Sequence, residues 1–471
     1  METSIAGILT VLFVFYLFVK KKNFLEELVF WCLIFETFVE LGIVVKIGSS
    51  EMGPARFLEH ILALYCLIQV RMIPANICRS WLLLILSYIL PLVILFFYPT
   101  QLAGGFGEIT WDSILQAGED PVRPSVNGDV IKMTLRLILY SFIIVCVYVN
   151  YSKEMYLRLL SRTANICKIL LILGLIEFVC RNFLGLNDFV ETAKTAFFGD
   201  TKFTFHGRLR GSLYELQLFM KETSHYAYTL FLTALILLAN NKIFKKKLID
   251  KYLYLCLFLI AVSTSFSGIM FVVACIGILL LIRWSVLPRK KRNMEVTILV
   301  SSLFIFISSA FVLLNYFSDS FFGERLFLIY ENFGDLVAID WSRDNPMAYQ
   351  DGSSVIRIIS VTQTLVAFFS RPIFGYSLNT FVCHGSTAMY LANVGVFGVL
   401  IFVWFFFYIF PFKRMMAPRK GFYSVAILIY FLVNLLNSYL LAPFMGLIPL
   451  MIALCFSCYF SESLQKEFKF K

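Results

Sequence analysis

Charged residues are scarce in this sequence. Asp, Glu, Lys and Arg make up 15% of its 471 residues, while hydrophobic residues make up 59%. A soluble protein of this length carries far more charge on its surface, so a soluble globular fold is excluded. The mean hydropathy of +0.80 instead predicts an integral membrane protein.

Several motifs of nucleotide-driven and metal-binding proteins are also missing. No P-loop and no phosphate-cradling GxGxxG is visible, so ATP-driven action has no support. The eleven cysteines lack the CxxC…CxxC spacing of a zinc site, and we expect no metal and no cofactor. Basic cytoplasmic loops explain the net charge of +11 better than nucleic acid does, so no nucleic-acid partner is expected.

The chain has instead a series of apolar runs, each about long enough to cross a bilayer. They cover residues 5–19, 28–45, 57–73, 81–98, 130–149, 164–180, 223–238, 248–262, 269–284, 296–316, 391–410, 422–436 and 441–460. The stretch 248–284 counts as two helices, because basic residues flank both of its ends and require an even number of crossings. The sequence therefore predicts an all-α polytopic membrane protein of about 13 transmembrane helices, with residues 1–471 as one integral membrane domain.

The basic residues also predict the orientation. Short segments that hold most of the Lys and Arg, such as Lys20–Lys22 and Arg289–Arg292, should be cytoplasmic. This puts the N-terminus outside and the C-terminus inside. Three outer loops follow, at residues 99–129, 181–221 and 317–390, and we expect the last, between helices 10 and 11, to cap the active-site side.

All four histidines and several arginines fall on the outer side in this topology. Arginine suits phosphate oxygens, and histidine suits general-base chemistry. These residues form two polar clusters that each lead from outside into an apolar span: Arg208, Arg210, Glu222 and His225 in the first, and Arg357, Arg371 and His384 in the second. We expect the clusters to face one cavity, where arginines hold a leaving pyrophosphate and a histidine or glutamate deprotonates an incoming hydroxyl.

Acidic residues within the apolar runs leave a second interpretation open. Glu36 and Glu40 lie one helical turn apart in the second span, where acids mark proton relays or pair with a basic residue of a neighbouring helix. Glu177 and Arg181 have the i, i+4 spacing of an ordinary helix pair, and we interpret them as structural.

The second cluster contains a recognisable order of residues. Arg357 and the run 371–375 come first, and His384 follows with Gly385 after it and with Gly395 and Gly398 further on. This order resembles the bacterial O-antigen polymerase and O-antigen ligase superfamily of membrane glycosyltransferases. His384, Gly395 and Gly398 match the ligase family's motif of a histidine and two glycines, with Gly385 at the second position, and Arg357 and the run 371–375 are similar to the superfamily's arginine and P-x-x-G run before that histidine.

The first cluster carries the rest of the resemblance. Arg210-Gly211 and the stretch 222–227 are similar to the superfamily's R-x-x-G … E-P-S-x-x-A pattern, with Thr223 in place of proline. Ser265-Phe266-Ser-Gly268 stands where many members have S-R-S-G. The resemblance covers about residues 208–410, and such a degenerate match fits the variable polymerases better than the ligases.

The resemblance implies a function and roles for single residues. The family's substrate is an undecaprenyl-pyrophosphate-linked oligosaccharide, polymerised into O-antigen or capsule by metal-independent glycosyl transfer on the outer leaflet of the bacterial inner membrane. His384 would be the general base, and Arg357 with Arg210 or Arg208 would bind the pyrophosphate. Glu222 would orient the acceptor. The remaining substrate-binding candidates are His225 and Arg371, and a chain-length regulator protein is a candidate partner.

Two other functions stay open. An O-antigen ligase would transfer the finished chain once onto a lipid A core. A flippase for the same lipid-linked oligosaccharide belongs to a different class, and Glu36 and Glu40 are its main support. No internal repeat of the kind that transporters often contain is visible, which favours an enzyme.

Overall fold

The structure is a computed structural model. It describes residues 3–97 with gaps at 21–22, 40, 48–49 and 70–72; 125–199 with a gap at 151–152; 209–263 with gaps at 211–212, 221–222 and 245–249; and 361–409 with gaps at 362–363 and 382–385. Most of these residues are helical, which agrees with the predicted all-α membrane protein.

The N-terminal part of the fold comprises α1 (Ile5–Lys20), α2 (Phe24–Phe38), β1 (Val45–Ile47), β2 (Ser50–Met52), α3 (Pro54–Gln69) and α4 (Ala75–Phe97). The two strands form an antiparallel hairpin between α2 and α3. The predicted second span, 28–45, is therefore too long at its C-terminal end. Its helix ends at Phe38, and the apolar run continues into a strand after Gly42, whose φ of 106° is not helical.

The remaining described elements are α5 (Gly128–Asn150), α6 (Lys153–Asn182), α7 (Asn187–Phe198), β3 (Leu209–Arg210), β4 (Leu213–Tyr214), α8 (Thr223–Ile243), α9 (Lys251–Val262) and α14 (Ser386–Ile409). Helix α7 lies inside the predicted outer loop 181–221. The predicted spans 269–284, 296–316, 422–436 and 441–460 lie outside the described residues, as does Glu40.

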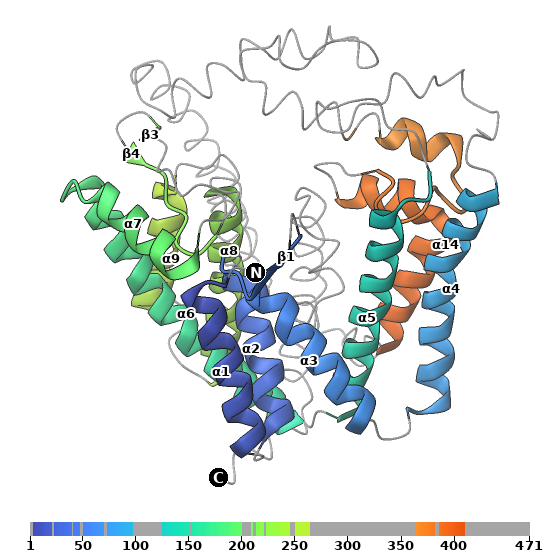
Figure 1. The fold of residues 1–471 in the computed structure, drawn as a ribbon, viewed down its shortest axis with the longest axis horizontal. Coiled ribbons are helices and arrows are strands. Elements are labelled where there is room, and N and C mark those ends of the chain that lie inside the picture. The colour runs from blue at the N-terminus through green and yellow to red at the C-terminus, as the bar shows by residue number, and fades with distance from the viewer. Residues whose placement is uncertain are drawn as a thin grey trace, which may run out of the picture.

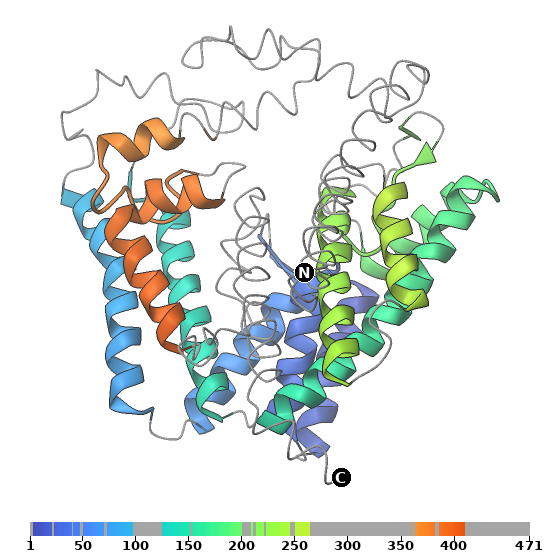
Figure 2. The same ribbon diagram turned by 180° about the vertical axis from the view of Figure 1, so that it is seen from behind.

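The described helices form two groups (Figures 1 and 2). One holds α1, α2, α3 and α6–α9, and the other holds α4, α5 and α14. Helices α3 and α5 pack together where the groups meet. There the Tyr140 hydroxyl donates to buried Glu59 at 2.5 Å, and Arg136 Nε donates to that hydroxyl at 2.7 Å. Glu36 lies within electrostatic range of Arg136 and Tyr140.

Three described helices are long and apolar enough to cross a membrane: Ala75–Phe97, Gly128–Val147 and Leu157–Asn182. Four shorter apolar helices accompany them: Ile5–Lys20, His225–Leu238, Lys251–Ile260 and Ala388–Phe402. Large apolar side chains such as Phe15 on α1, Phe96 on α4 and Ile176 on α6 are exposed, as expected for surfaces that contact lipid. The chain is thus a helical membrane protein, while 13 spans and their sidedness remain predictions.

Two ion pairs join α2 to the N-terminal half of α6. Arg158 makes two hydrogen bonds of 3.0 Å to the Glu26 carboxylate, and Arg162 makes bonds of 2.9 and 2.7 Å to Glu27. The Arg162 and Glu27 side chains are 36% and 27% exposed, so water screens much of this second pair.

Candidate functional site

The first predicted cluster contains a short hairpin. Leu209 pairs with Tyr214 and Arg210 pairs with Leu213, so the main chain of Arg210 is fixed in an antiparallel ladder. Asn182, the last residue of α6, accepts a 2.7 Å hydrogen bond from the Tyr214 N–H through its side-chain oxygen. The hairpin that bears Arg210 is therefore attached to the end of a membrane-spanning helix.

A second contact attaches the segment that follows the hairpin. The N–H of Leu218 donates to Glu177 Oε2 at 2.8 Å, and Glu177 precedes Asn182 on α6. Leu218 has a φ of 46°, in the left-handed region that non-glycine residues rarely adopt. Two side chains of α6 thus hold residues 214–218, and the Glu177 bond stabilises the strained conformation at Leu218.

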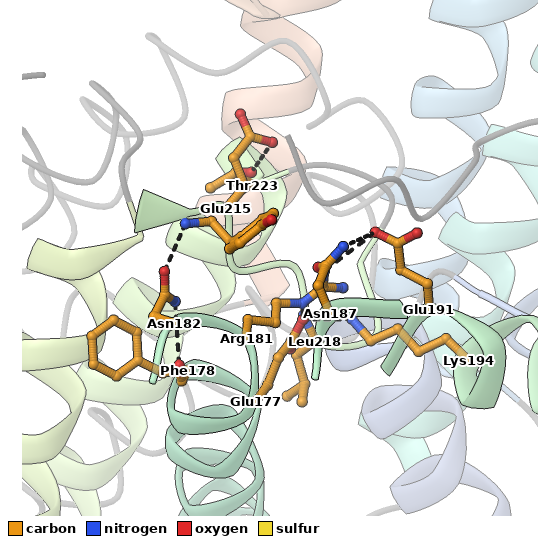
Figure 3. A network of polar contacts seen from close by, with 11 residues as sticks. Glu177, Phe178, Arg181, Asn182, Asn187, Glu191, Lys194, Glu215, Leu218 and Thr223 are labelled. Atoms are coloured by element: carbon orange, nitrogen blue, oxygen red, sulfur yellow. Dashed lines mark hydrogen bonds and ion pairs between the residues drawn. The ribbon is translucent and has the colours of Figure 1, made fainter. Parts of the chain in front are cut away.

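Glu177 is the centre of a buried ionic network (Figure 3). Its Oε1 accepts from Arg181 Nε at 2.9 Å and from Lys194 Nζ at 2.7 Å. Arg181, whose side chain is 0% exposed, also donates through Nη1 to Asn187 and contacts Glu191 at 3.5 Å. The predicted Glu177–Arg181 pair is present, but it belongs to a network that joins α6 to α7.

The network balances its charges. Two carboxylates, Glu177 and Glu191, face two cations, Arg181 and Lys194, so the cluster is close to neutral. Burial lowers the pKa of Lys194, and the attraction of the Glu177 carboxylate opposes this shift. Breaking such a buried pair on one side leaves an uncompensated charge away from water.

Helix α8 begins directly after this segment. Thr223, its first residue, donates from its hydroxyl to Glu215 Oε2 at 2.8 Å. His225 is buried rather than exposed in an open loop, and its carbonyl accepts from the Thr229 hydroxyl at 2.9 Å. The Thr229 hydroxyl also contacts the Thr37 carbonyl of α2 at 3.2 Å. The helix that carries His225 is thereby fixed to α2 within the bundle.

Arg371 is the member of the second predicted cluster that the structure describes. This side chain is 8% exposed, and its guanidinium lies 4.6 Å from the ring centre of Tyr376. Burial lowers the pKa of Arg371, with the tyrosine opposing the shift, but an arginine remains charged at neutral pH. The Tyr376 hydroxyl lies 2.6 Å from the Ser370 hydroxyl, so the aromatic ring under the guanidinium is itself fixed.

Helix α14 is broken at Gly395, and the break joins two predicted motif segments. Gly395 has φ 66° and ψ −177°, a conformation reached essentially by glycine alone. The N–H groups of Val396 and Phe397 donate to the carbonyls of Pro372 and Ile373 at 2.8 and 3.1 Å. The run 371–375 and the glycine motif of α14 are therefore in direct main-chain contact.

The contact also runs in the opposite direction. The N–H groups of Tyr376 and Ser377 donate to the carbonyls of Ala392 and Asn393 at 3.0 and 2.7 Å. Gly375, with φ 67°, lies so close that a Cβ there would meet the Asn393 carbonyl at 2.6 Å. The Asn393 side chain bonds both the N–H and the carbonyl of Phe381. Glycine is thus required on both sides of the contact.

Gly395→Ala is expected to destabilise the protein. The backbone conformation alone costs about 1–3 kcal/mol for a non-glycine residue, and the added Cβ would lie 2.2 Å from the Ile373 carbonyl oxygen. The midpoint of thermal unfolding in detergent would measure the loss. Gly128→Ala, with no atom within 4 Å of its added Cβ, is the matched control. Equal midpoints for the two variants would contradict this role of Gly395.

The two clusters lie toward the same end of the molecule, on different helix groups (Figures 1 and 2). The hairpin β3–β4 is at the end of the group that contains α6 and α8, and residues 364–381 precede α14 in the other group. Arg208, Glu222, Arg357 and His384 lie outside the described residues. That both clusters share one cavity remains a prediction.

The partners of Glu177 that are distant in the chain could not be predicted from local spacing. Lys194 and Leu218 follow Glu177 by 17 and 41 residues. The i, i+4 spacing of Glu177 and Arg181 was the only local signal. Glu177 and Arg181 lie at the very end of an apolar run, where buried charges need further partners. Such a position indicates that the adjoining loop supplies those partners.

Comparisons of the chain with protein-family models, with curated proteins and with solved structures find no match.

Proposed function

We propose that the protein is a membrane glycosyltransferase that polymerises undecaprenyl-pyrophosphate-linked oligosaccharide units into O-antigen or capsular polysaccharide. The main support is the position of the Arg210 hairpin and the Arg371–Gly375 run, each fixed to an apolar helix at the same end of the molecule. A substrate with a membrane-bound lipid tail and a water-soluble sugar chain presents its pyrophosphate at such a boundary.

The proposed chemistry exchanges one bond for another. A hydroxyl of the incoming unit attacks the anomeric carbon of the growing chain, and the bond from that carbon to the pyrophosphate oxygen breaks. His384 takes the hydroxyl proton, and undecaprenyl pyrophosphate leaves with the bonding electron pair. Arg210 and Arg357 bind the leaving pyrophosphate, because a guanidinium fork matches its oxygens and stabilises their negative charge.

His225 and Arg371 take supporting roles in this proposal. Both side chains are buried. We therefore assign them to positioning the substrate or the neighbouring main chain. Arg371 lies beside Pro372, whose carbonyl accepts from the start of the second half of α14. It can therefore couple substrate binding to the break in that helix.

A purified sample in liposomes would test the proposal. The substrate is the native lipid-linked repeat unit, and the products are resolved on a gel with and without a lipid A core acceptor. A ladder without acceptor is the expected result. A single acceptor-dependent shift would favour the ligase. No new glycosidic product would overturn both enzymes and favour the flippase, for which the buried Glu59–Tyr140–Arg136 contact would be the first region to examine.

A further inference from the structure

Helix α7 presents three different faces around its axis. The side chains that face the protein are those of Asn187, Glu191, Lys194 and Phe198, at the spacing of one helical stripe. Asn187, Glu191 and Lys194 join the ionic network of Glu177, and Phe198 packs on Phe219 with ring centres 5.4 Å apart. One face of the helix is therefore held against the bundle.

The outward surface of α7 is divided in two. One arc is apolar, with Leu186 just before the helix followed by Phe189, Ala193 and Phe197, all exposed. Phe189 is 67% exposed, which is unusual for phenylalanine in contact with water. The adjoining arc is polar and holds Asp188, Thr192 and Thr195. An outward surface with one apolar and one polar side indicates a helix at a boundary between two media.

The apolar arc continues the lipid-facing surface of α6. Exposed Ile172, Ile176 and Val179 follow one stripe along that membrane-spanning helix. The stripe runs into Phe183 and Leu184, which are 71% and 59% exposed in the turn between α6 and α7. Exposed apolar side chains thus follow the chain from the spanning helix through the turn to α7.

We infer that α7 is an interfacial helix whose apolar arc inserts into the membrane leaflet at this end of the molecule. The orientation predicted from the basic residues makes this the outer leaflet. The partner is the lipid itself, at the level where acyl chains meet headgroups. Continuity with the surface of a spanning helix favours lipid over a second protein, and the polar arc of Asp188, Thr192 and Thr195 then faces the headgroups and water.

This contact has a consequence for the candidate site. The inner face of α7 supplies Lys194 to Glu177, and Glu177 holds the N–H of Leu218. Helix α7 and the segment that follows the Arg210 hairpin are therefore joined to the same carboxylate of α6. The inference itself rests on the membrane location of the chain and not on the proposed enzymatic activity.

A photo-crosslinking experiment would test the inference on the full-length protein. The residue p-benzoyl-phenylalanine replaces Phe189 or Phe197 on the apolar arc, and Asp188 or Thr195 on the polar arc in matched controls. The protein is placed in nanodiscs of phosphatidylethanolamine and phosphatidylglycerol, irradiated, and analysed by mass spectrometry for adducts. All four positions are exposed, so the substitutions should leave the elution profile in detergent unchanged.

Lipid adducts are expected at positions 189 and 197, several-fold above those at 188 and 195. Equal lipid labelling of the two arcs would overturn the interfacial orientation. Labelling of 189 and 197 by a second protein chain, or by a distant part of the same chain in place of lipid, would show that protein covers the apolar arc and would also overturn it.

Discussion

Glu177→Ala is expected to destabilise the protein by about 3–5 kcal/mol, the range for removing one partner of a buried ionic network. The carboxylate receives hydrogen bonds from Arg181, Lys194 and the Leu218 N–H. After its loss Glu191 is the remaining carboxylate of the described network for two buried cations, and a buried N–H loses its acceptor. The expected observation is a lower midpoint of thermal unfolding in detergent.

Two comparisons separate the network from a general effect of charge removal. Arg162→Ala also removes an ion pair of α6, but one that is partly exposed, so its loss should be about 1 kcal/mol or less. Lys194→Ala should destabilise the protein less in the Glu177→Ala background than alone, because the partner is already missing. Equal losses for Glu177→Ala and Arg162→Ala would show that the buried network contributes little.

His384→Ala is expected to reduce glycosyl transfer by about 10²- to 10⁴-fold, the usual contribution of a general base. In the proposed reaction His384 accepts the proton of the attacking hydroxyl. Initial rates of ladder formation in liposomes would measure the loss, with membrane insertion and elution profile as in the wild type. Arg357→Ala should cause a comparable loss, because it removes a ligand of the leaving pyrophosphate.

The neighbouring cysteine is the matched control for His384. Cys383→Ala changes the adjacent residue and should leave the rate nearly unchanged, because the proposed chemistry uses no thiol. A rate in His384→Ala equal to that of the wild type would remove the histidine from the mechanism. A large loss in Cys383→Ala would instead favour a nucleophilic cysteine.

The hydropathy of the chain predicted the long apolar helices among the described residues. Helices α4, α5 and α6 each overlap a predicted span, because an apolar run of this length satisfies its main-chain groups in a membrane only as a helix. The rule failed after Phe38, where an apolar run leaves the helix and enters a hairpin. Composition cannot distinguish a strand at the end of such a run from another helical turn.

The contacts between distant segments could not be predicted in the same way. The glycines at 375 and 395 were recognised as parts of two motifs, but nothing in their spacing shows that their main chains touch. Helix α7 was assigned to a loop, because its short length and mixed faces do not resemble a span. Its separation of Phe189 and Phe197 from Asp188 on different arcs follows a helical period and could have been found in the sequence.

The break in α14 also determines how this part of the chain opens. Tyr376 and Ser377 lie outside any helix, yet their amides are bound to carbonyls of α14, and the amides of Val396 and Phe397 are bound in return. Neither segment can separate without exposing the main-chain groups of the other. Residues 372–377 and the middle of α14 should therefore fluctuate as one cooperative unit, with the slow opening of a packed helix instead of the fast motion of a loop.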